Sequence, residues 1–282
     1  MNAQIIIMVL MAAFFHAVWN ASVKLSDDKV LSITGIQGTT VLMVLPLVPF
    51  VGLPEPESWP YLLASVALHL GYYIALASAY QYGDFSQAYP VARGTAPILV
   101  TFWGVFVLHE SLSVIELVSV VGVITGIMIF ATRRLGVVLH DRKALAGALV
   151  TSCFIGGYTI VDGIGGRLSL NVPAYMVWLA ILDGSPMVLY AIRQRSLAQV
   201  IALKSKWRIS LFGSVLSLAA YWMVVSAMTQ APIPLVSAIR ETSIIIAALI
   251  GAYYFKEPAG KRRIVASIVI FISIALLGWS DS

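Results

Sequence analysis

The chain carries AYPVARGTAPILVTFWGVFVLHES at residues 88–111 and repeats its pattern, without a gap, at residues 235–258 as LVSAIRETSIIIAALIGAYYFKEP. The alignment places Arg93 over Arg240 and Glu110 over Glu257. The two halves of the chain are therefore predicted to be copies of one another. Because each copy holds five apolar spans, an odd number, the second copy is inverted relative to the membrane. Inverted repeats are typical of secondary transporters, whose halves exchange conformations around a shared midplane site.

The composition is that of a membrane protein. Apolar residues make up 60% of the chain and charged residues only 11%, whereas soluble domains carry about 25% charged residues. Apolar runs of roughly 20 residues recur, each long enough to cross ~30 Å of hydrocarbon at ~1.5 Å per residue. We place ten spans at 4–23, 31–52, 59–82, 86–108, 113–132, 144–163, 172–192, 207–229, 233–255 and 261–280.

The predicted fold class is an all-α membrane protein with ten transmembrane helices in two inverted five-helix repeats. We expect the first repeat at 1–135, a cytoplasmic linker at 136–143 within the basic segment RRLGVVLHDRK, and the second repeat at 144–282. The amino terminus lacks a basic n-region and its apolar run has spanning length, so we interpret it as a retained first helix rather than a signal peptide. The lone Cys153 excludes an internal disulfide.

The basic residues indicate the orientation. Of the 18 lysines and arginines, all but Arg93, Arg167 and Arg240 fall on one predicted side of the membrane. By the positive-inside rule that side is cytoplasmic, so both termini are expected to be external, in a multi-pass protein of the inner membrane. The net charge of +5 is thereby a topological feature, and we expect no nucleic-acid partner.

Ionisable groups within the spans are the best candidates for function, because each costs at least ~2.5 kcal/mol at the membrane centre unless it is paired or hydrated. Arg93 and Arg240 each lie about seven residues into their spans. A guanidinium group is permanently charged and suits a carboxylate or phosphate, so either arginine could anchor an anionic group. The alternative is a structural ion pair, and Glu241 beside Arg240 can offset its charge locally.

Pro90 and Pro97 bracket Arg93. A proline frees a backbone carbonyl and bends a helix, which membranes tolerate only where the freed groups meet protein or water. The span 86–108 is therefore the best candidate for a broken, cavity-lining helix. A helix that is merely kinked for packing is the alternative.

Polar and aromatic residues share faces of several spans. His16, Asn20 and Lys24 fall on one face of the first span, beside Trp19, and His69, Tyr73 and Tyr80 follow helical spacing in the third. Such faces are costly toward lipid and natural toward a cavity. The predicted cavity residues are His16, Trp19, Asn20, His69, Tyr73, Tyr80, Tyr89, Arg93, Tyr158, Trp178, Trp222 and Arg240.

Three acidic residues are candidates for proton coupling: Asp183, Glu241 and Asp162. Asp183 lies near the middle of its span and precedes Gly184 and Pro186, so it occupies a predicted kink. An isolated carboxylate at that depth is desolvated, which favours its protonated form and suits proton exchange. A buried aspartate paired with an arginine is the alternative.

Two further features have structural explanations. Gly122 and Gly126 form a GxxxG pattern that predicts close helix packing, within the chain or between protomers. Glu110 and Glu257 end their spans, where capping the next helix or pairing with a nearby cation is simpler than binding a substrate.

The patterns YPVARGTAP followed by HES, and SAIRETS followed by KEP, resemble the drug/metabolite transporter superfamily, in its ten-helix EamA-type members. HAVWNASVK is similar to the first-helix pattern of that family. The resemblance implies a basket-like bundle whose central cavity is lined by spans 1, 3, 4, 6, 8 and 9, with spans 5 and 10 packing the halves together. The second half departs from the first where Pro90, Gly94 and Pro97 become Ser237, Glu241 and Ile244.

We expect a secondary transporter, with export the favoured direction, for a small metabolite such as an amino acid or related organic ion. It would work by alternating access around the midplane cavity, as a monomer, with proton coupling as an option. A flippase for lipids or lipid-linked molecules is the alternative. A membrane-embedded enzyme is the least favoured reading, because HExxH, GxSxG and CxxC are absent from the sequence. We therefore expect no catalytic residue, cofactor or metal.

Overall fold

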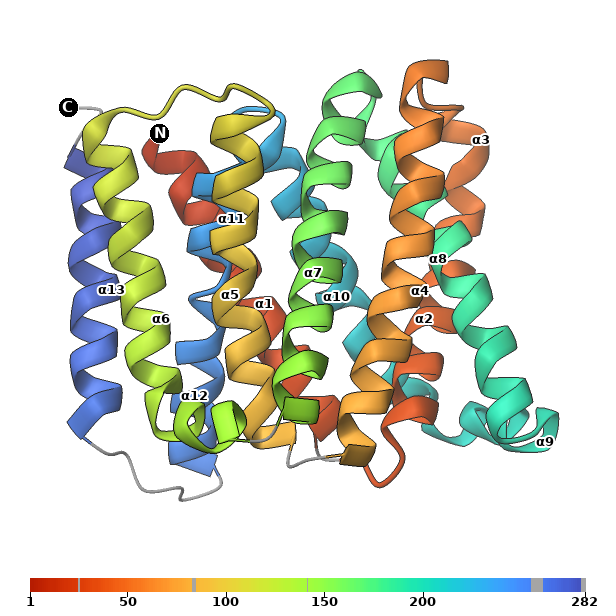
Figure 1. Cartoon of the computed structure of the whole chain (residues 1–282). Coiled ribbons are helices and arrows are strands. Elements are labelled where there is room, and N and C mark those ends of the chain that lie inside the picture. The colour runs from red at the N-terminus through yellow and green to blue at the C-terminus, as the bar shows by residue number, and fades with distance from the viewer. Residues whose placement is uncertain (25, 83–84, 141, 255–260, 280–282) are drawn as a thin grey trace.

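The computed structural model describes the chain except residues 25, 83–84, 141, 255–260 and 280–282, and side chains at 24, 76–92, 130–144, 248, 251–263 and 279 also lie outside its described part. Helices occupy all ten predicted spans (Figure 1). The first half forms α1 (Ala3–Lys24), α2 (Lys29–Val44), η1 (Leu45–Leu47), α3 (Val48–Val51), η2 (Pro56–Ser58), α4 (Trp59–Tyr82), α5 (Phe85–Phe106) and α6 (Val114–His140). The second half forms α7 (Arg142–Leu168), α8 (Val172–Gln194), α9 (Leu197–Ala202), η3 (Leu203–Lys206), α10 (Trp207–Met228), α11 (Ile233–Arg240), α12 (Ser243–Tyr254) and α13 (Lys261–Trp279).

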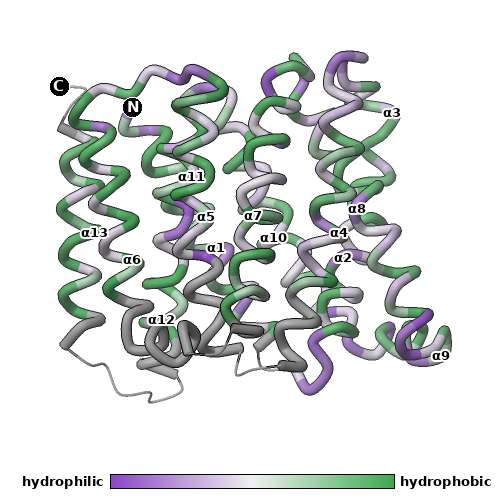
Figure 2. Tube along the Cα trace, in the orientation of Figure 1, coloured by the Kyte–Doolittle hydropathy of each residue, from purple (hydrophilic) through white to green (hydrophobic). Residues whose placement is uncertain are grey.

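The outer surface of the bundle is apolar. Large side chains such as Phe50, Phe106 and Phe271 are 86%, 66% and 74% exposed, which is expected where the surrounding solvent is hydrocarbon. Figure 2 shows hydrophobic residues along α6 and α13 and hydrophilic residues concentrated near α9 and at helix ends. Within the described residues, five segments have both the length and the apolarity to cross a membrane: 3–23, 29–51, 145–168, 172–194 and 197–228. Shorter apolar helices occupy 114–129 and 264–278.

The main helix contacts occur between the repeats, in equivalent pairs. The first helix of the first repeat, α1, packs on α10, and its counterpart α7 packs on α4. Likewise α5 packs on α7 as α12 packs on α1, while α2 packs on α8 and α6 on α13. Each half therefore completes its packing only against the other, as two inverted copies joined into one bundle require.

The GxxxG pattern of α6 lies against α13. A side chain at Gly122 would collide with Ser273, and a Cβ at Gly126 would lie 3.1 Å from the Ala266 carbonyl oxygen, besides meeting Ile270. Small residues let the two helices approach this closely. The prediction of packing within the chain is confirmed, and α6 and α13 join the two halves as the resemblance implied.

The broken helix is span 9, not span 4. α5 continues through Pro90 and Pro97 from Phe85 to Phe106, so the prediction of a broken span 4 is wrong. A proline removes one backbone hydrogen bond, and the other bonds of a helix can still hold it together.

Span 9 stops at Arg240 and resumes at Ser243. The N–H groups of Thr242 and Ile244 donate to the carbonyls of Ile239 and Glu241 at 3.0 Å each, which are i to i+3 bonds. The Thr242 hydroxyl also donates to the Ile239 carbonyl, at 2.7 Å. The polar run Arg-Glu-Thr-Ser thus breaks this helix, because its side chains compete with the regular backbone bonds.

An ion pair joins the two repeats at the α9 end of the bundle. The beginning of α1 and the end of α13 lie at one end, and α9 lies at the other (Figure 1). At the α9 end, Arg195 donates from Nε to Asp28, the N-cap of α2, at 2.7 Å. Partial burial by itself would raise the pKa of Asp28, but the hydrogen bonds from Arg195 and the Leu31 amide outweigh it, so the pKa lies below its ordinary value. Both partners of this pair are about one-third exposed, so it adds little to stability.

Candidate functional site

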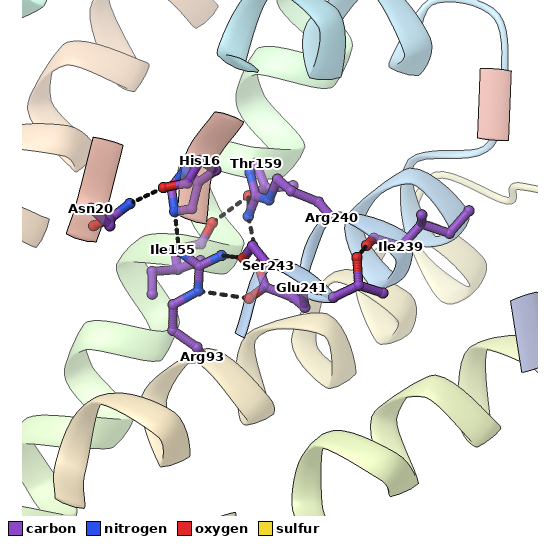
Figure 3. Close-up of polar contacts among 10 residues, drawn as sticks. His16, Asn20, Arg93, Ile155, Thr159, Ile239, Arg240, Glu241 and Ser243 are labelled. Atoms are coloured by element: carbon purple, nitrogen blue, oxygen red, sulfur yellow. Dashed lines mark hydrogen bonds and ion pairs between the residues drawn. The ribbon is translucent and has the colours of Figure 1, made fainter. Parts of the chain in front are cut away.

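Arg93 of α5 is buried inside the bundle and is only 3% exposed. Its Nε donates to Glu241 Oε2 at 2.6 Å and its Nη2 to Ser243 Oγ at 3.3 Å (Figure 3). Its Nη1 lies 2.8 Å from His16 Nε2. Because a guanidinium group can only donate, His16 Nε2 must accept, so the imidazole is neutral and carries its proton on Nδ1.

Arg240, the last residue of α11, contacts the same glutamate and belongs to the second repeat, whereas Arg93 belongs to the first. Its Nη2 donates to Glu241 Oε1 and to Thr159 Oγ1, each at 3.2 Å. The guanidinium carbon lies 5.9 Å from the centroid of the Tyr158 ring, within cation–π range. Arg240 Nε is buried and has no hydrogen-bond partner among the described residues.

We call this group, composed of His16, Arg93, Thr159, Arg240, Glu241 and Ser243, the arginine cluster. Its charges are two guanidinium groups and one carboxylate, and Glu241 is fully buried. Burying charge is tolerated only where partners compensate the lost hydration. One carboxylate shared by two arginines leaves a net positive charge among these three residues, so the cluster can attract an anion.

Aromatic rings extend from the arginine cluster. The His69 ring stacks on Tyr158 with centroids 4.2 Å apart, and Tyr221 meets His69 edge-on at 5.8 Å. Tyr73 follows at 6.4 Å from His69. These four rings, which we call the aromatic stack, come from α4, α7 and α10. Their flat apolar faces lie next to the Arg240 guanidinium group, which contacts the Tyr158 ring.

Two carboxylates border the aromatic stack: Asp162, which is buried, and Asp183, which is half-buried. Asp162 of α7 accepts hydrogen bonds from the hydroxyls of Tyr175, at 2.8 Å, and Tyr221. Asp183 of α8 accepts from Gln37 Nε2 at 2.9 Å and from the Tyr73 hydroxyl at 3.2 Å. All four donors to the two aspartates are neutral side chains. These bonds therefore do not support the alternative in which a buried aspartate pairs with an arginine. Within the described part of the chain no grouping of three or more His, Cys, Asp or Glu suits a metal ion.

A second charged group joins the two repeats at the opposite end from α9. Arg167 of α7 donates to Glu110 Oε1 at 2.6 Å, and also to the carbonyls of Met228, at 2.7 Å, and Ala231, at 2.9 Å. Glu110 Oε2 accepts from the Ile233 N–H at 2.8 Å. We call these contacts the Glu110–Arg167 clasp. Glu110 therefore caps α11 and pairs with a cation, which confirms its structural interpretation, although the capped helix is not the next one along the chain.

The structure brings together only part of the predicted cavity set. His16, Arg93 and Arg240 meet in the arginine cluster, and His69, Tyr73 and Tyr158 form most of the aromatic stack. Trp19 lies edge-on to His16 with centroids 5.4 Å apart. Asn20 donates to the His16 carbonyl of its own helix at 2.8 Å.

The remaining members lie elsewhere. Trp178 donates from Nε1 to the Gly52 carbonyl at 2.9 Å and pairs with Trp59 at 5.7 Å, at a loop end of the bundle. Trp222 packs against an apolar group that includes Leu62 and Tyr175. The side chains of Tyr80 and Tyr89 fall outside the described residues.

Residues of these groups that are absent from the predicted site residues include Gln37, Thr159, Arg167, Tyr175, Tyr221 and Ser243. Arg167 carried a usable indication, because it is the single basic residue predicted for the external side. Gln37 is a lone amide between Gly35 and Gly38 of span 2, which also marks it for a contact within the bundle. Thr159 and Ser243 resemble ordinary small polar residues of a helix, so no sequence pattern distinguishes them.

Helices at the ten predicted spans, in two repeats with charged side chains buried where the repeats meet, are typical of membrane transporters. The chain belongs to the EamA-like transporter family, whose model matches residues 3–132 and again 142–279. This places it in the drug/metabolite transporter superfamily and confirms the resemblance seen in the sequence.

A solved structure described as "Crystal structure of protein" is similar to this chain with a TM-score of 0.73. It is 14% identical, and the match covers 97% of this chain and 95% of the other. At this identity the similarity shows the fold alone. No curated protein matches the chain.

Proposed function

We propose that this transporter carries a small metabolite bearing a carboxylate, such as an amino acid or a related organic anion, and that it exports it across the inner membrane as a monomer. The observation that carries the proposal is the meeting of Arg93 and Arg240, one from each repeat, on the single carboxylate of Glu241. A guanidinium group binds a carboxylate through two parallel hydrogen bonds. The site thus combines excess positive charge with contacts from both moving halves.

The aromatic stack supports an organic rather than an inorganic anion. Tyr158 contacts Arg240 on one side and His69 on the other. A ligand whose carboxylate binds the arginines would place its carbon skeleton against these rings. Each Å² of apolar ligand surface buried there would contribute about 25 cal/mol to the binding free energy. We assign proton coupling to Asp162, Asp183 and Glu241, because each is a buried or half-buried carboxylate in or beside this region.

Alternating access requires contacts between the repeats that form at one end while the other end opens. The Glu110–Arg167 clasp is such a contact, since Glu110 belongs to the first repeat and Arg167 to the second. By the positive-inside rule its end is external. We therefore propose that the clasp closes the external end and releases when the site opens outward.

The proposed orientation predicts which loops an impermeant thiol reagent can reach. Both termini and the loops at Glu110 and Arg167 are external, whereas 133–143 and 193–206 are cytoplasmic. In a Cys153→Ala background, a cysteine at Ser282 should be labelled in intact cells, and a matched cysteine at Ser205, exposed beside α9, should be labelled only after lysis. Protection of Ser282→Cys together with labelling of Ser205→Cys in intact cells would reverse the orientation.

Flux into proteoliposomes tests the function directly. Purified protein is reconstituted, a pool of labelled metabolites is offered with and without a proton gradient, and uptake is measured in both membrane orientations. We expect saturable flux of carboxylate-bearing solutes that a proton gradient changes. Scrambling of a fluorescent lipid without solute flux would indicate a flippase, and chemical conversion of a solute would indicate an enzyme.

A further inference from the structure

We propose that Glu241 is a built-in occupant of the carboxylate site, which holds both arginines when no substrate is bound and must leave when a substrate carboxylate enters. The inference rests on the proposed function, because it assumes that the arginine cluster receives an anion. It adds a residue that sets specificity and apparent affinity. Glu241 is a positioning residue in this scheme, since it acts on the substrate through the arginines.

The bonding of Glu241 is that of a bound carboxylate. Its two oxygens are divided between the repeats, with Oε2 on Arg93 at 2.6 Å and Oε1 on Arg240 at 3.2 Å. A substrate carboxylate that bridged the same two guanidinium groups would need the same donors. Because both arginines are at most 5% exposed, the site has no bulk water to compensate a second anion beside the first.

The cluster offers more donors than Glu241 uses. Arg240 Nε is buried without a hydrogen-bond partner among the described residues. A buried polar group left unsatisfied costs about 1–3 kcal/mol, so native proteins rarely retain one without a reason. A ligand that brings more acceptor atoms than one glutamate would satisfy donors that Glu241 leaves unused.

The backbone at Glu241 suits a residue that must move. Glu241 lies in the break between α11 and α12, where the N–H groups of Thr242, Ile244 and Ile245 make i to i+3 hydrogen bonds. Changes in a few such residues at helix ends can produce hinge motions. Rotation at this break can withdraw the Glu241 carboxylate without unwinding the α11 residues that precede it.

Two consequences follow for recognition. A neutral analogue cannot replace the charge of Glu241, so the site discriminates against amides and alcohols of the same shape. The apparent affinity for a true substrate is also lower than the intrinsic affinity, because only the molecules whose arginines are free of Glu241 can bind it. If Glu241 occupies the arginines in about nine molecules of ten, removing its carboxylate tightens substrate binding roughly tenfold.

Carboxylate binding to the purified protein tests the inference through the isosteric change Glu241→Gln. Sodium acetate and sodium benzoate are titrated against the thermal unfolding midpoint in detergent, with sodium chloride at equal ionic strength as the salt control. We expect saturable stabilisation of Glu241→Gln with a midpoint concentration roughly tenfold lower than for the wild type. Glu116→Gln, which neutralises a glutamate at the start of α6 that bonds Ser113 and belongs to neither the arginine cluster nor the clasp, should respond as the wild type does, and Glu241→Gln/Arg93→Gln should lose the response.

Each outcome bears on the inference. Equal midpoints for Glu241→Gln and the wild type, with a response that depends on Arg93, would overturn the role of Glu241 and leave the proposed function standing. No carboxylate response in either protein would contradict both. If Glu241→Gln folds poorly in chloride, its recovery during purification becomes the readout. Greater recovery in benzoate than in chloride then supports the inference, and equal recovery in the two salts overturns it.

Discussion

Replacing Arg93 with lysine is expected to weaken the apparent affinity for the transported carboxylate by roughly ten- to a hundredfold in a protein that still folds. Lysine retains the charge but lacks the planar fork, so a bound carboxylate loses a charge-assisted hydrogen bond worth about 1.5–3 kcal/mol. The measurement is the concentration dependence of flux in proteoliposomes. Arg208→Lys, which changes an exposed arginine on α10, is the matched control and should transport normally.

The stability of arginine cluster variants distinguishes a binding role from a purely structural one. Arg93→Ala leaves Glu241 paired with Arg240, so it should cost only about 1–3 kcal/mol of unfolding free energy. Glu241→Ala leaves two buried guanidinium groups without their carboxylate and should cost about 3–5 kcal/mol. Thermal unfolding of Arg93→Ala, Arg240→Ala and Glu241→Ala checks this order. Unchanged transport affinity in folded Arg93→Ala would remove Arg93 from the substrate site.

Replacing Arg167 with alanine is expected to open the external end of the transporter and to lower the unfolding free energy by about 2–3 kcal/mol. The change removes the ion pair with Glu110 and the hydrogen bonds to the carbonyls of Met228, at the end of α10, and Ala231, which follows it. The magnitude lies below that of a fully buried pair, because Arg167 is 36% exposed.

Opening can be measured at Ser237, which lies on α11 between the clasp and Arg240 and is 1% exposed. In a Cys153→Ala background, an impermeant thiol reagent applied from outside should label Ser237→Cys several times faster when Arg167→Ala is also present. Arg195→Ala is the matched control, because its ion pair with Asp28 also joins the repeats but at the α9 end and with both partners about one-third exposed. Equal acceleration by both variants would show that the clasp is not a specific external closure.

The sequence by itself determined the architecture. Hydropathy, the repeated pattern around Arg93 and Arg240, and the odd number of spans per copy sufficed to predict ten helices in two inverted repeats. These features are local, because the length of an apolar run and the order of residues along it decide whether a segment can span the membrane. The buried arginines were also predictable, since a charge within a span is rare enough to indicate function or pairing.

Only the tertiary structure decided how these residues meet. Arg93 and Glu241 are 148 residues apart, and Gln37 and Asp183 are 146 apart. Their pairing depends on how each helix is rotated against its neighbours, which no single span records. The same cause explains why Trp178 lies at a loop end, away from the arginine cluster, and why Glu110 caps α11 rather than the helix that follows it.

The position of the broken helix is the clearest case of this division. The prolines of span 4 are a local feature and predicted a break there, yet α5 is continuous. Span 9 is interrupted instead, at the polar run Arg-Glu-Thr-Ser, and Glu241 of that run pairs with Arg93, which belongs to the other repeat. A buried carboxylate and guanidinium group gain more from meeting than a short stretch of backbone gains from regular helical bonds, and that comparison exists only after the two repeats have packed together.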